Sequence, residues 1–210
     1  PGSTTTASRP LVAALYSDEG SGVDPASIRL FLDGAEVTAQ SVITASSISF
    51  HPGADLAQGL HTASATVSDR AGNAASAAAS FIVDSVAPQT LLVIGDPRFG
   101  TGPVKITSAT PLGFAVSEAG RTYYAVDSGS FTQFSAAVTL STEGLRTLRY
   151  FSSDAAGNAE AVRTEALGLD ASVPRTSLTL SGPSFTGPGG RLFVSSATAV
   201  GLSAEDPSID

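Results

Sequence analysis

The sequence lacks three residue types entirely: its 210 residues include no cysteine, no methionine and no tryptophan. Without cysteine, the chain has no disulfide, no thiolate metal ligand and no cysteine nucleophile. Charge is also scarce and one-sided, since charged residues form 14% of the chain and the formal net charge is -8. Nucleic acids and anionic membranes bind basic surfaces, so neither is an expected partner. No apolar run approaches the roughly 18–20 residues of a membrane span.

The sequence contains many hydrophobic residues, and they occur in short runs. Hydrophobic residues form 42% of the chain, which is enough to build a core. Ile28, Leu30 and Leu32 alternate with other residues before an Asp-Gly pair, which is the period-2 pattern of a strand closed by a turn. The run Ala74–Ala79 has helical propensity, but it lies between a Gly-Asn pair and the β-type run Phe81–Val83, so we predict a strand there. These patterns predict an all-β fold.

Two stretches of the sequence repeat each other at a distance near 86 residues. Gly59–Thr62 (Gly-Leu-His-Thr) recurs as Gly144–Thr147 (Gly-Leu-Arg-Thr), 85 residues later. In both copies an Asp-x-Ala-Gly-Asn motif begins seven residues after the threonine. Val83–Thr90 recurs as Leu169–Thr176, 86 residues later. Such a period is too long for a solenoid repeat of about 20–50 residues and fits a small β-sandwich of about 100 residues.

This period divides the chain into three predicted units: residues 1–86, residues 87–172 and a partial third repeat at residues 173–210. The third unit stops at less than half a period, and half a sandwich cannot bury both of its sheets. Position 1 is also not methionine. We therefore expect either that the natural chain continues or that another molecule completes this piece.

Several motifs resemble those of bacterial immunoglobulin-like repeats, which occur in tandem in large secreted and surface proteins. In the first unit they are Tyr16–Pro25, Leu32-Asp33-Gly34, Gly59–Thr62 and Asp69–Asn73. In the second unit, Tyr124–Gly129 and Tyr150–Asp154 are similar to a related sandwich module. The resemblance covers nearly the whole chain and implies tandem immunoglobulin-like β-sandwiches joined by short proline-containing linkers. The chain departs from the family pattern at both ends, because the first strand that members carry before the position of Ser3 is missing and the third unit lacks its second half.

The Asp-x-Ala-Gly-Asn motif has a structural interpretation. Glycine supplies the positive φ of a tight turn, asparagine tolerates a left-handed backbone, and aspartate accepts backbone N–H bonds across the turn. The predicted turn residues are Asp69, Gly72, Asn73, Asp154, Gly157 and Asn158. The predicted linkers carry Asp84 and Pro88, then Asp170 and Pro174, and their prolines favour an extended connection.

Calcium is the alternative role for the aspartates of the turns and linkers. The resemblance implies that some tandem relatives stiffen their junctions with calcium, which here would use Asp69, Asp84, Asp154 and Asp170. Calcium takes six to eight oxygen ligands, however, and no Asp-x-Asp-x-Asp cluster or EF-hand loop is present. The competing interpretation is that Asp84 and Asp170 cap strand ends before the linkers. No other cofactor is expected.

The residue types that carry catalysis form no recognisable set. The two histidines, His51 and His61, both lie in the first unit, and His61 stands where the second unit has Arg146. No Gly-x-Ser-x-Gly motif marks a serine nucleophile, and the histidines lack zinc-ligand spacing. We therefore predict that the chain is not an enzyme.

Aromatic residues concentrate in the second unit, where Tyr123 and Tyr124 are adjacent and Tyr150 and Phe151 are adjacent. Neighbours in a strand point to opposite faces, so one residue of each pair is expected to face outward. An outward aromatic can stack on a sugar or contact a protein partner. The alternative is cross-strand packing on an outer sheet face.

Together with the resemblance, the sequence predicts a non-enzymatic extracellular or cell-surface module: a spacer, stalk or adhesin arm of a larger bacterial protein. The expected partners are neighbouring repeats, with copies of the chain itself, a glycan or a surface protein as further candidates. Two alternative functions stay open. A unit without its first strand exposes an unpaired edge, which a strand from another chain would fill to build an extracellular filament. The outward aromatics would instead suit a carbohydrate-binding accessory module of a secreted hydrolase.

Overall fold

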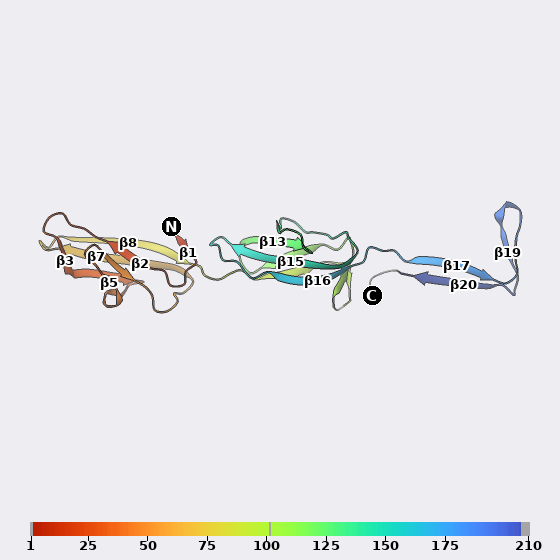
Figure 1. The fold of residues 1–210 in the computed structure, drawn as a ribbon, viewed down its shortest axis with the longest axis horizontal. Coiled ribbons are helices and arrows are strands. Elements are labelled where there is room, and N and C mark those ends of the chain that lie inside the picture. Colours follow the sequence, from red (N-terminus) through yellow and green to blue (C-terminus); the bar gives the residue numbers. More distant parts are fainter. Residues whose placement is uncertain (1, 101, 207–210) are drawn as a thin grey trace. The chain divides into compact units, whose positions relative to one another are not determined.

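The computed structural model describes residues 2–100 and 102–206 (Figure 1). Strands make up nearly all of the regular structure, which confirms the predicted all-β fold. The chain forms two compact units: the first holds the chain up to Thr90, Val116–Thr122 and Phe151–Ala161, and the second holds Leu91–Ala115, Tyr123–Tyr150 and the chain from Val162 on. The repeat boundaries after residues 86 and 172 stay a prediction. Among the described residues, no helix has the length and apolar character needed to cross a membrane.

Two facing sheets build the first sandwich (Figure 1). One sheet has the strand order β1-β8-β7-β3-β4 and the other has the order β2-β6-β5. The elements are β1 Thr4–Thr5, β2 Val12–Leu15, β3 Val23–Leu32, β4 Ala35–Glu36, the 3-10 helix η1 Thr38–Gln40, β5 Val42–Ile43, β6 Ser47–Phe50, β7 Gly59–Asp69 and β8 Ala74–Val83. Most neighbours are antiparallel, but β1 runs parallel to β8.

The core of the first sandwich comes from the alternation seen in the sequence. Ile28, Leu30 and Leu32 of β3 lie on one face of the strand, and each is 7% exposed or less. They belong to one apolar cluster with Val12 of β2 and Ile48 of β6. The cluster joins the two sheets, because burying apolar area between them is the main stabilising contribution to such a fold.

Strand β8 confirms the prediction for the alanine-rich run. Ala74–Ala79 pairs antiparallel with β7, from Ala74 opposite Ser68 to Ala79 opposite Ala63. The ladder continues without a break to Val83 opposite Gly59. Pairing along the whole strand overrides the helical propensity of alanine, which is a weak local preference.

The second sandwich has a sheet with the order β10-β11-β16-β15-β13-β14 and a two-stranded sheet, β12-β9. The strands are β9 Thr90–Ile94, β10 Arg98–Phe99, β11 Val104–Ile106, β12 Leu112–Val116, β13 Gly120–Val126, β14 Thr132–Gln133, β15 Gly144–Asp154 and β16 Arg163–Leu169. Its buried core residues are Ile106, Leu112, Leu140, Leu148, Tyr150, Leu167 and Leu169. Leu92 and Ile94 of β9 pack against this core.

The two sandwiches share one pairing scheme between an early strand and their last strand. β11 runs parallel to β16, as β1 runs parallel to β8. Just beyond each pair, the backbone N–H of Asp84 donates to the carbonyl of Thr5 at 3.0 Å, and that of Asp170 donates to the carbonyl of Ile106 at 2.9 Å. The repeated sequence motifs therefore occupy equivalent places in the two folds.

The C-terminal segment forms two strand pairs and the short helix η2, Pro188–Gly190. β17 Arg175–Ser181 pairs with β20 Ala199–Glu205, and β18 Ser184–Thr186 pairs with β19 Leu192–Val194. Large apolar side chains are exposed here, with Leu178 at 63%, Phe185 at 67% and Leu202 at 81%. Within the described residues, this segment adds no side chain to either core cluster.

We expect Ile28→Ala to destabilise the first sandwich by about 2–5 kcal/mol, because the truncation leaves a cavity in a packed core. Ile28 is 2% exposed, whereas Leu60 on β7 is 67% exposed. Leu60→Ala is therefore the control and should cost less than about 0.5 kcal/mol. Urea denaturation followed by circular dichroism measures both losses, and equal losses would contradict this assignment of the core.

Candidate functional site

A carboxylate holds the hairpin turn that follows β3. Asp33 has a left-handed backbone with a φ of 51°. Its Oδ1 accepts the backbone N–H of Thr62 at 2.8 Å, and its Oδ2 lies 2.7 Å from Nδ1 of His61. The other ring nitrogen of His61, Nε2, lies 2.8 Å from the carbonyl oxygen of Ala57. The turn, β7 and the loop before β7 thus meet at one imidazole.

The second sandwich rebuilds this contact with a different cation. Asp127 also has a left-handed backbone, with a φ of 53°. Its carboxylate accepts the backbone N–H of Thr147 and the guanidinium of Arg146, both at 3.0 Å. Arg146 also donates to the backbone carbonyls of Thr142 and Glu143. The motifs Gly-Leu-His-Thr and Gly-Leu-Arg-Thr therefore place an imidazole and a guanidinium in the same structural role.

The surroundings of His61 favour its charged form. The residue is 7% exposed, its ring stacks on Phe81 at 5.5 Å, and both ring nitrogens face oxygen acceptors. A neutral imidazole donates from one nitrogen only, so the imidazolium alone satisfies both contacts. The bond to Ala57, followed by the bond to Asp33, raises the pKa of His61 against the effect of burial. Burial alone would raise the pKa of Asp33, but the bonds from Thr62 and His61 hold it below its ordinary value.

The two Asp-x-Ala-Gly-Asn motifs form similar turns. In the first, Asp69 Oδ1 accepts the backbone N–H of Asn73 at 2.8 Å and Oδ2 accepts the Asn73 side-chain amide at 2.7 Å. In the second, Asp154 Oδ1 accepts the N–H groups of Gly157 and Asn158 at 2.7 and 2.9 Å. The glycines of the two turns have φ values of 90° and 102°. Bonds from the side chain and backbone of Asn73 lower the pKa of Asp69.

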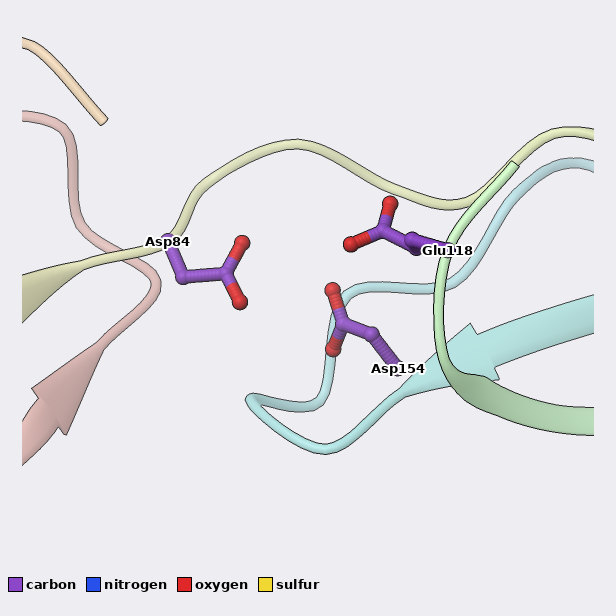
Figure 2. A group of neighbouring side chains, drawn as sticks. All are labelled: Asp84, Glu118 and Asp154. Carbon is purple, nitrogen blue, oxygen red and sulfur yellow. The ribbon is translucent and has the colours of Figure 1, made fainter. Parts of the chain in front are cut away.

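Three carboxylates from distant parts of the chain converge within the first of the two compact units, the one that includes Val116–Thr122 and Phe151–Ala161 (Figure 2). Asp84 follows β8, Glu118 lies in the loop between β12 and β13, and Asp154 ends β15. One carboxylate oxygen from each lies within 4.8 Å of the others, and Figure 2 shows the three groups pointing toward one another. We call these three residues the carboxylate group. In the described part of the chain, none of them joins an ion pair.

Asn158 links two members of the carboxylate group. Its side-chain amide donates to Asp154 Oδ2 and to the backbone carbonyl of Asp84, both at 2.8 Å. Burial alone would raise the pKa of Asp154, but bonds from Asn158 and Gly157 hold it below its ordinary value. The turn therefore presents an ionised carboxylate to its two neighbours.

The donors of the carboxylate group fit a hard divalent cation. Carboxylate oxygens are ligands of calcium and magnesium more than of soft transition metals. Calcium–oxygen distances of about 2.3–2.6 Å place opposite ligands at most about 5 Å apart, so a spread of 4.8 Å allows all three oxygens to reach one ion. Three carboxylates fall short of six to eight oxygens, and backbone carbonyls or water would supply the rest.

The structure brings together two of the four aspartates that the sequence suggests for calcium. Asp84 and Asp154 belong to the carboxylate group, whereas Asp69 and Asp170 lie outside it. The third member, Glu118, is a residue that the sequence motifs do not indicate. The three carboxylates therefore come from three separate segments of the chain and not from one motif.

The two predicted linkers are placed differently. Asp84 belongs to the carboxylate group, whereas Asp170 Oδ1 accepts the backbone N–H of Ser172 at 3.2 Å. Pro88 is fully buried and Pro174 is exposed. Only the first linker is therefore packed at its proline.

A buried hydroxyl network joins strands β9, β13 and β15 and is a further feature that the sequence does not reveal. Ser152 Oγ lies 2.6 Å from Thr90 Oγ1 and 2.8 Å from Thr122 Oγ1. Glu160 accepts the backbone N–H of Ser152 at 2.9 Å. Thr90 and Ser152 are completely buried, so these bonds satisfy groups that water does not reach.

The structure places two of the four aromatics that were candidates for a surface role against the core. Tyr150 is 2% exposed, and Tyr124 packs against the same core. The ring of Phe114 lies 5.1 Å from that of Tyr150 and 6.4 Å from that of Tyr124. Tyr123 and Phe151 occupy the opposite faces and are half-buried. Each adjacent pair is thus divided between two faces, but none of the four rings is fully exposed.

We expect the first sandwich to lose stability as the pH rises through the pKa of folded His61. That pKa lies above 6.5, so the stabilisation is complete below about pH 6.5 and is lost above the folded pKa. Asp33 contributes stability at higher pH, because folding lowers the pKa of its carboxyl group below 3.8. This contribution to stability is present above about pH 3.8 and is lost as the pH falls through the pKa of Asp33 in the folded protein. Differential scanning calorimetry at a series of pH values measures the melting temperature of the first sandwich and tests both expectations.

Exchanging the two cations provides the control. His61→Arg should flatten the alkaline loss, because a guanidinium stays charged at every pH of interest. Arg146→His should introduce an alkaline loss into the second sandwich. A wild-type transition that is unchanged between about pH 6 and about pH 9 would contradict the imidazolium assignment.

Three solved structures are similar to this chain at low sequence identity. The fibronectin(III)-like modules of CbhA from Clostridium thermocellum share 10% identity at a TM-score of 0.39, over 81% of this chain and 90% of theirs. A tetra-tandem repeat in the extending region of a large adhesion protein shares 18% identity at a TM-score of 0.34, over 96% of this chain and 66% of its own. A Ca2+-stabilized adhesin with which an Antarctic bacterium binds ice shares 17% identity at a TM-score of 0.35, over 84% of this chain and 48% of its own.

A search of curated proteins gives no match to the sequence. A match to a protein-family model begins at Asp18, in the loop after β2, and ends at Ser85, just beyond β8. The matched stretch contains strands β3 to β8, which include the buried residues of β3 and the complete β7–β8 ladder. Residues 18–85 match the family of bacterial Ig-like domains.

Proposed function

We propose that the chain is a non-enzymatic structural module of a larger bacterial protein, acting as a spacer, stalk or adhesin arm at the cell surface or outside the cell. One observation carries this proposal: both sandwiches repeat the contact that holds the hairpin turn, but with different cations. Asp33 pairs with His61, and Asp127 pairs with Arg146. A shared chemical activity would require the same reactive residue in both sandwiches. A shared structural role requires only an equivalent hydrogen bond or ion pair at the turn.

The lining of a groove in the first sandwich does not suit acid–base catalysis. It has a volume of about 510 Å³ and lies between β2 and β8 over the core, and we call it the β2–β8 groove. Aliphatic, hydroxyl and one phenol side chain line it, among them Ala14, Leu15, Ile48, Ala65 and Ala77, with no carboxylate, imidazole or amine. Acid–base catalysis needs a titratable group within reach of a bound substrate, and this lining does not provide one near neutral pH.

Force spectroscopy tests the structural role. A chain held at its two ends should unfold in separate steps, because each sandwich has its own core. Each step should release up to about 280–310 Å for a repeat of 86 residues. Gradual extension without steps would overturn the spacer proposal.

Affinity electrophoresis in polysaccharide gels separates the spacer from the carbohydrate-binding alternative. A spacer should migrate at the same rate with and without polysaccharide. Retardation that Tyr123→Ala or Phe151→Ala removes would instead assign a glycan to the second sandwich. These two residues are the test positions, because Tyr124 and Tyr150 belong to the core.

We also propose that the carboxylate group binds calcium and thereby stiffens the first unit. The support is the geometry of three carboxylates within 4.8 Å of one another, with no cationic side chain paired to them among the described residues. Bringing three negative charges together is unfavourable unless a cation neutralises them. Asp84, Glu118 and Asp154 come from separate segments, so one shared ion would tie those segments together.

Calcium should raise the melting temperature of the first unit. A ligand at about 100 times its dissociation constant stabilises the folded form by about 2.7 kcal/mol. Glu118→Gln should remove most of this gain, because an amide carries no charge. Glu19→Gln is the matched control, since Glu19 is exposed and lies outside the carboxylate group. A wild-type melting temperature that calcium does not change would contradict the calcium proposal and leave the spacer proposal intact.

A second candidate function is a subunit of an extracellular filament. The observation that favours it is the open edge of the first sandwich. Within the described residues, β2 has a strand neighbour, β6, on one side only. An edge of this kind is a template for a strand from another chain.

A further inference from the structure

Strand β9 of the second sandwich is aliphatic on both of its faces. Leu92 and Ile94 pack against the core cluster, whereas Leu91 and Val93 are 62% and 50% exposed. A slip of one residue along the neighbouring strand turns every side chain of a strand to its other face. In β9, such a slip replaces a leucine and an isoleucine at the core by a leucine and a valine. The burial of aliphatic side chains therefore gives only a weak preference for the observed face.

The structure nevertheless has one defined register for this strand. β9 lies antiparallel to β12: the N–H of Ser117 donates to the carbonyl of Gln89 at 3.0 Å, and that of Gly95 donates to the carbonyl of Pro111 at 2.9 Å. Backbone bonds of this kind also form in a slipped register, because every residue except proline carries the same backbone donor and acceptor. A side-chain contact must therefore select the register.

Thr90 is the one polar residue of β9, and it is completely buried. Its hydroxyl lies 2.6 Å from Ser152 Oγ and donates to Oε1 of Glu160. Its backbone N–H donates to Oε2 of the same carboxylate at 3.2 Å. Both polar groups at the start of the strand are therefore held by side chains from other segments, and both belong to the buried hydroxyl network (Thr90, Thr122, Ser152 and Glu160).

The bonds of the buried hydroxyl network form one chain with a single direction. A carboxylate only accepts, so Thr90 gives its one hydroxyl hydrogen to Glu160. Ser152 then donates to Thr90, and Thr122 donates to Ser152 at 2.8 Å. The backbone N–H of Ser152 also donates to Glu160, at 2.9 Å. The chain of bonds thus runs from β13 through β15 to β9 and ends on a carboxylate.

A slip of β9 by one residue breaks this chain of bonds. In one direction it brings Leu91 to the place of Thr90, and a leucine side chain neither donates nor accepts. Ser152 and Glu160 then lose a partner at a site that water does not reach, which is unfavourable. In the other direction it brings Gln89, whose larger side chain overpacks a site that holds a threonine. The network therefore opposes a slip that the aliphatic pattern tolerates.

The first sandwich has apolar side chains at the corresponding positions. Ser152 and Glu160 stand two residues before and two residues after the Asp-x-Ala-Gly-Asn motif, where the first sandwich has Val67 and Ala75. Val67 packs against the core of the first sandwich. Replacing buried polar groups by well-packed apolar residues is often neutral or stabilising, and the best-attested role of such groups beyond stability is to fix a register.

We propose that the buried hydroxyl network sets the register of β9, with Thr90 as the residue that selects which face of the strand is buried. The consequence reaches the linker, because the linker leads directly into Thr90. Asn158 holds the backbone carbonyl of Asp84, and Glu160 holds Thr90. The register therefore fixes which residues, Ser85–Gln89, lie between the two held points. This proposal does not rest on the spacer or the calcium proposal, and its failure leaves both standing.

Exchanging two neighbouring residues tests the proposal without changing the composition of the chain. The double variant Thr90→Leu with Leu91→Thr moves the hydroxyl one position along β9. We expect the strand to slip by one residue, so that the moved threonine enters the buried hydroxyl network. Val93 then becomes buried and Leu92 faces the solvent, which reverses the two faces of the strand.

A single engineered cysteine reports which face is buried, because the sequence has no cysteine of its own. In the otherwise unchanged chain, Val93→Cys should react with a maleimide at least about threefold faster than Leu92→Cys, because reaction of a thiol requires access. In the double variant this order should reverse. If Val93→Cys still reacts faster in the folded double variant, aliphatic packing sets the register and the proposal is overturned.

A second variant keeps the proposal testable if the double variant does not fold. Thr90→Val keeps the shape of the side chain and removes the hydroxyl. NMR should then show two sets of amide signals for β9 and β12, because two registers have become similar in stability. Thr147→Val is the matched control, since Thr147 is half-buried on β15 and lies outside the network. A single set of signals in Thr90→Val, as in the control, would overturn the proposal.

Discussion

Backbone N–H groups at the ends of strands need acceptors, because an unpaired donor away from water costs stability. Aspartates meet this need throughout the molecule. Asp33 and Asp127 close the hairpins, and Asp69 and Asp154 close the Asp-x-Ala-Gly-Asn turns. Charged residues form only 14% of the chain, and the main role of these four carboxylates is to hold turns in place. The carboxylate group depends on the same bonds, since the turn holds the carboxylate of Asp154 next to those of Asp84 and Glu118.

Features that depend on neighbours in the sequence could be predicted from it. The alternation of Ile28, Leu30 and Leu32 is a property of one strand, and one side of that strand is buried in the structure. The strand at Ala74–Ala79 could also be predicted, because a turn precedes this run and β-branched and aromatic residues follow it. In both cases the deciding information lies within about one strand length, where the period-2 rule applies.

Contacts between distant segments could not be predicted in the same way. Glu118 follows β12 and Ser117 as Asp18 follows β2 and Ser17, but that equivalence alone does not bring a carboxylate near Asp84. The sequence shows that His61 replaces an arginine, yet the pairing with a turn aspartate appears only when β3 and β7 are side by side. Alternation divides an aromatic pair between two faces without showing which face is the core. Each of these outcomes depends on which distant strands pair with each other, and the pattern within one strand does not identify its partner.

The parallel pairing at the end of each sandwich has a consequence for how such a chain yields under tension. Pulling along these strands shears their hydrogen bonds together, so the resistance of a unit grows with the number of paired residues. β11 and β16 pair at three positions, whereas β1 and β8 pair at two, Thr4 with Ile82 and Thr5 with Val83. We therefore expect the first sandwich to have the weaker mechanical clamp and to open at the lower force. A chain of such units would lengthen one unit at a time, in an order set by the length of these strands.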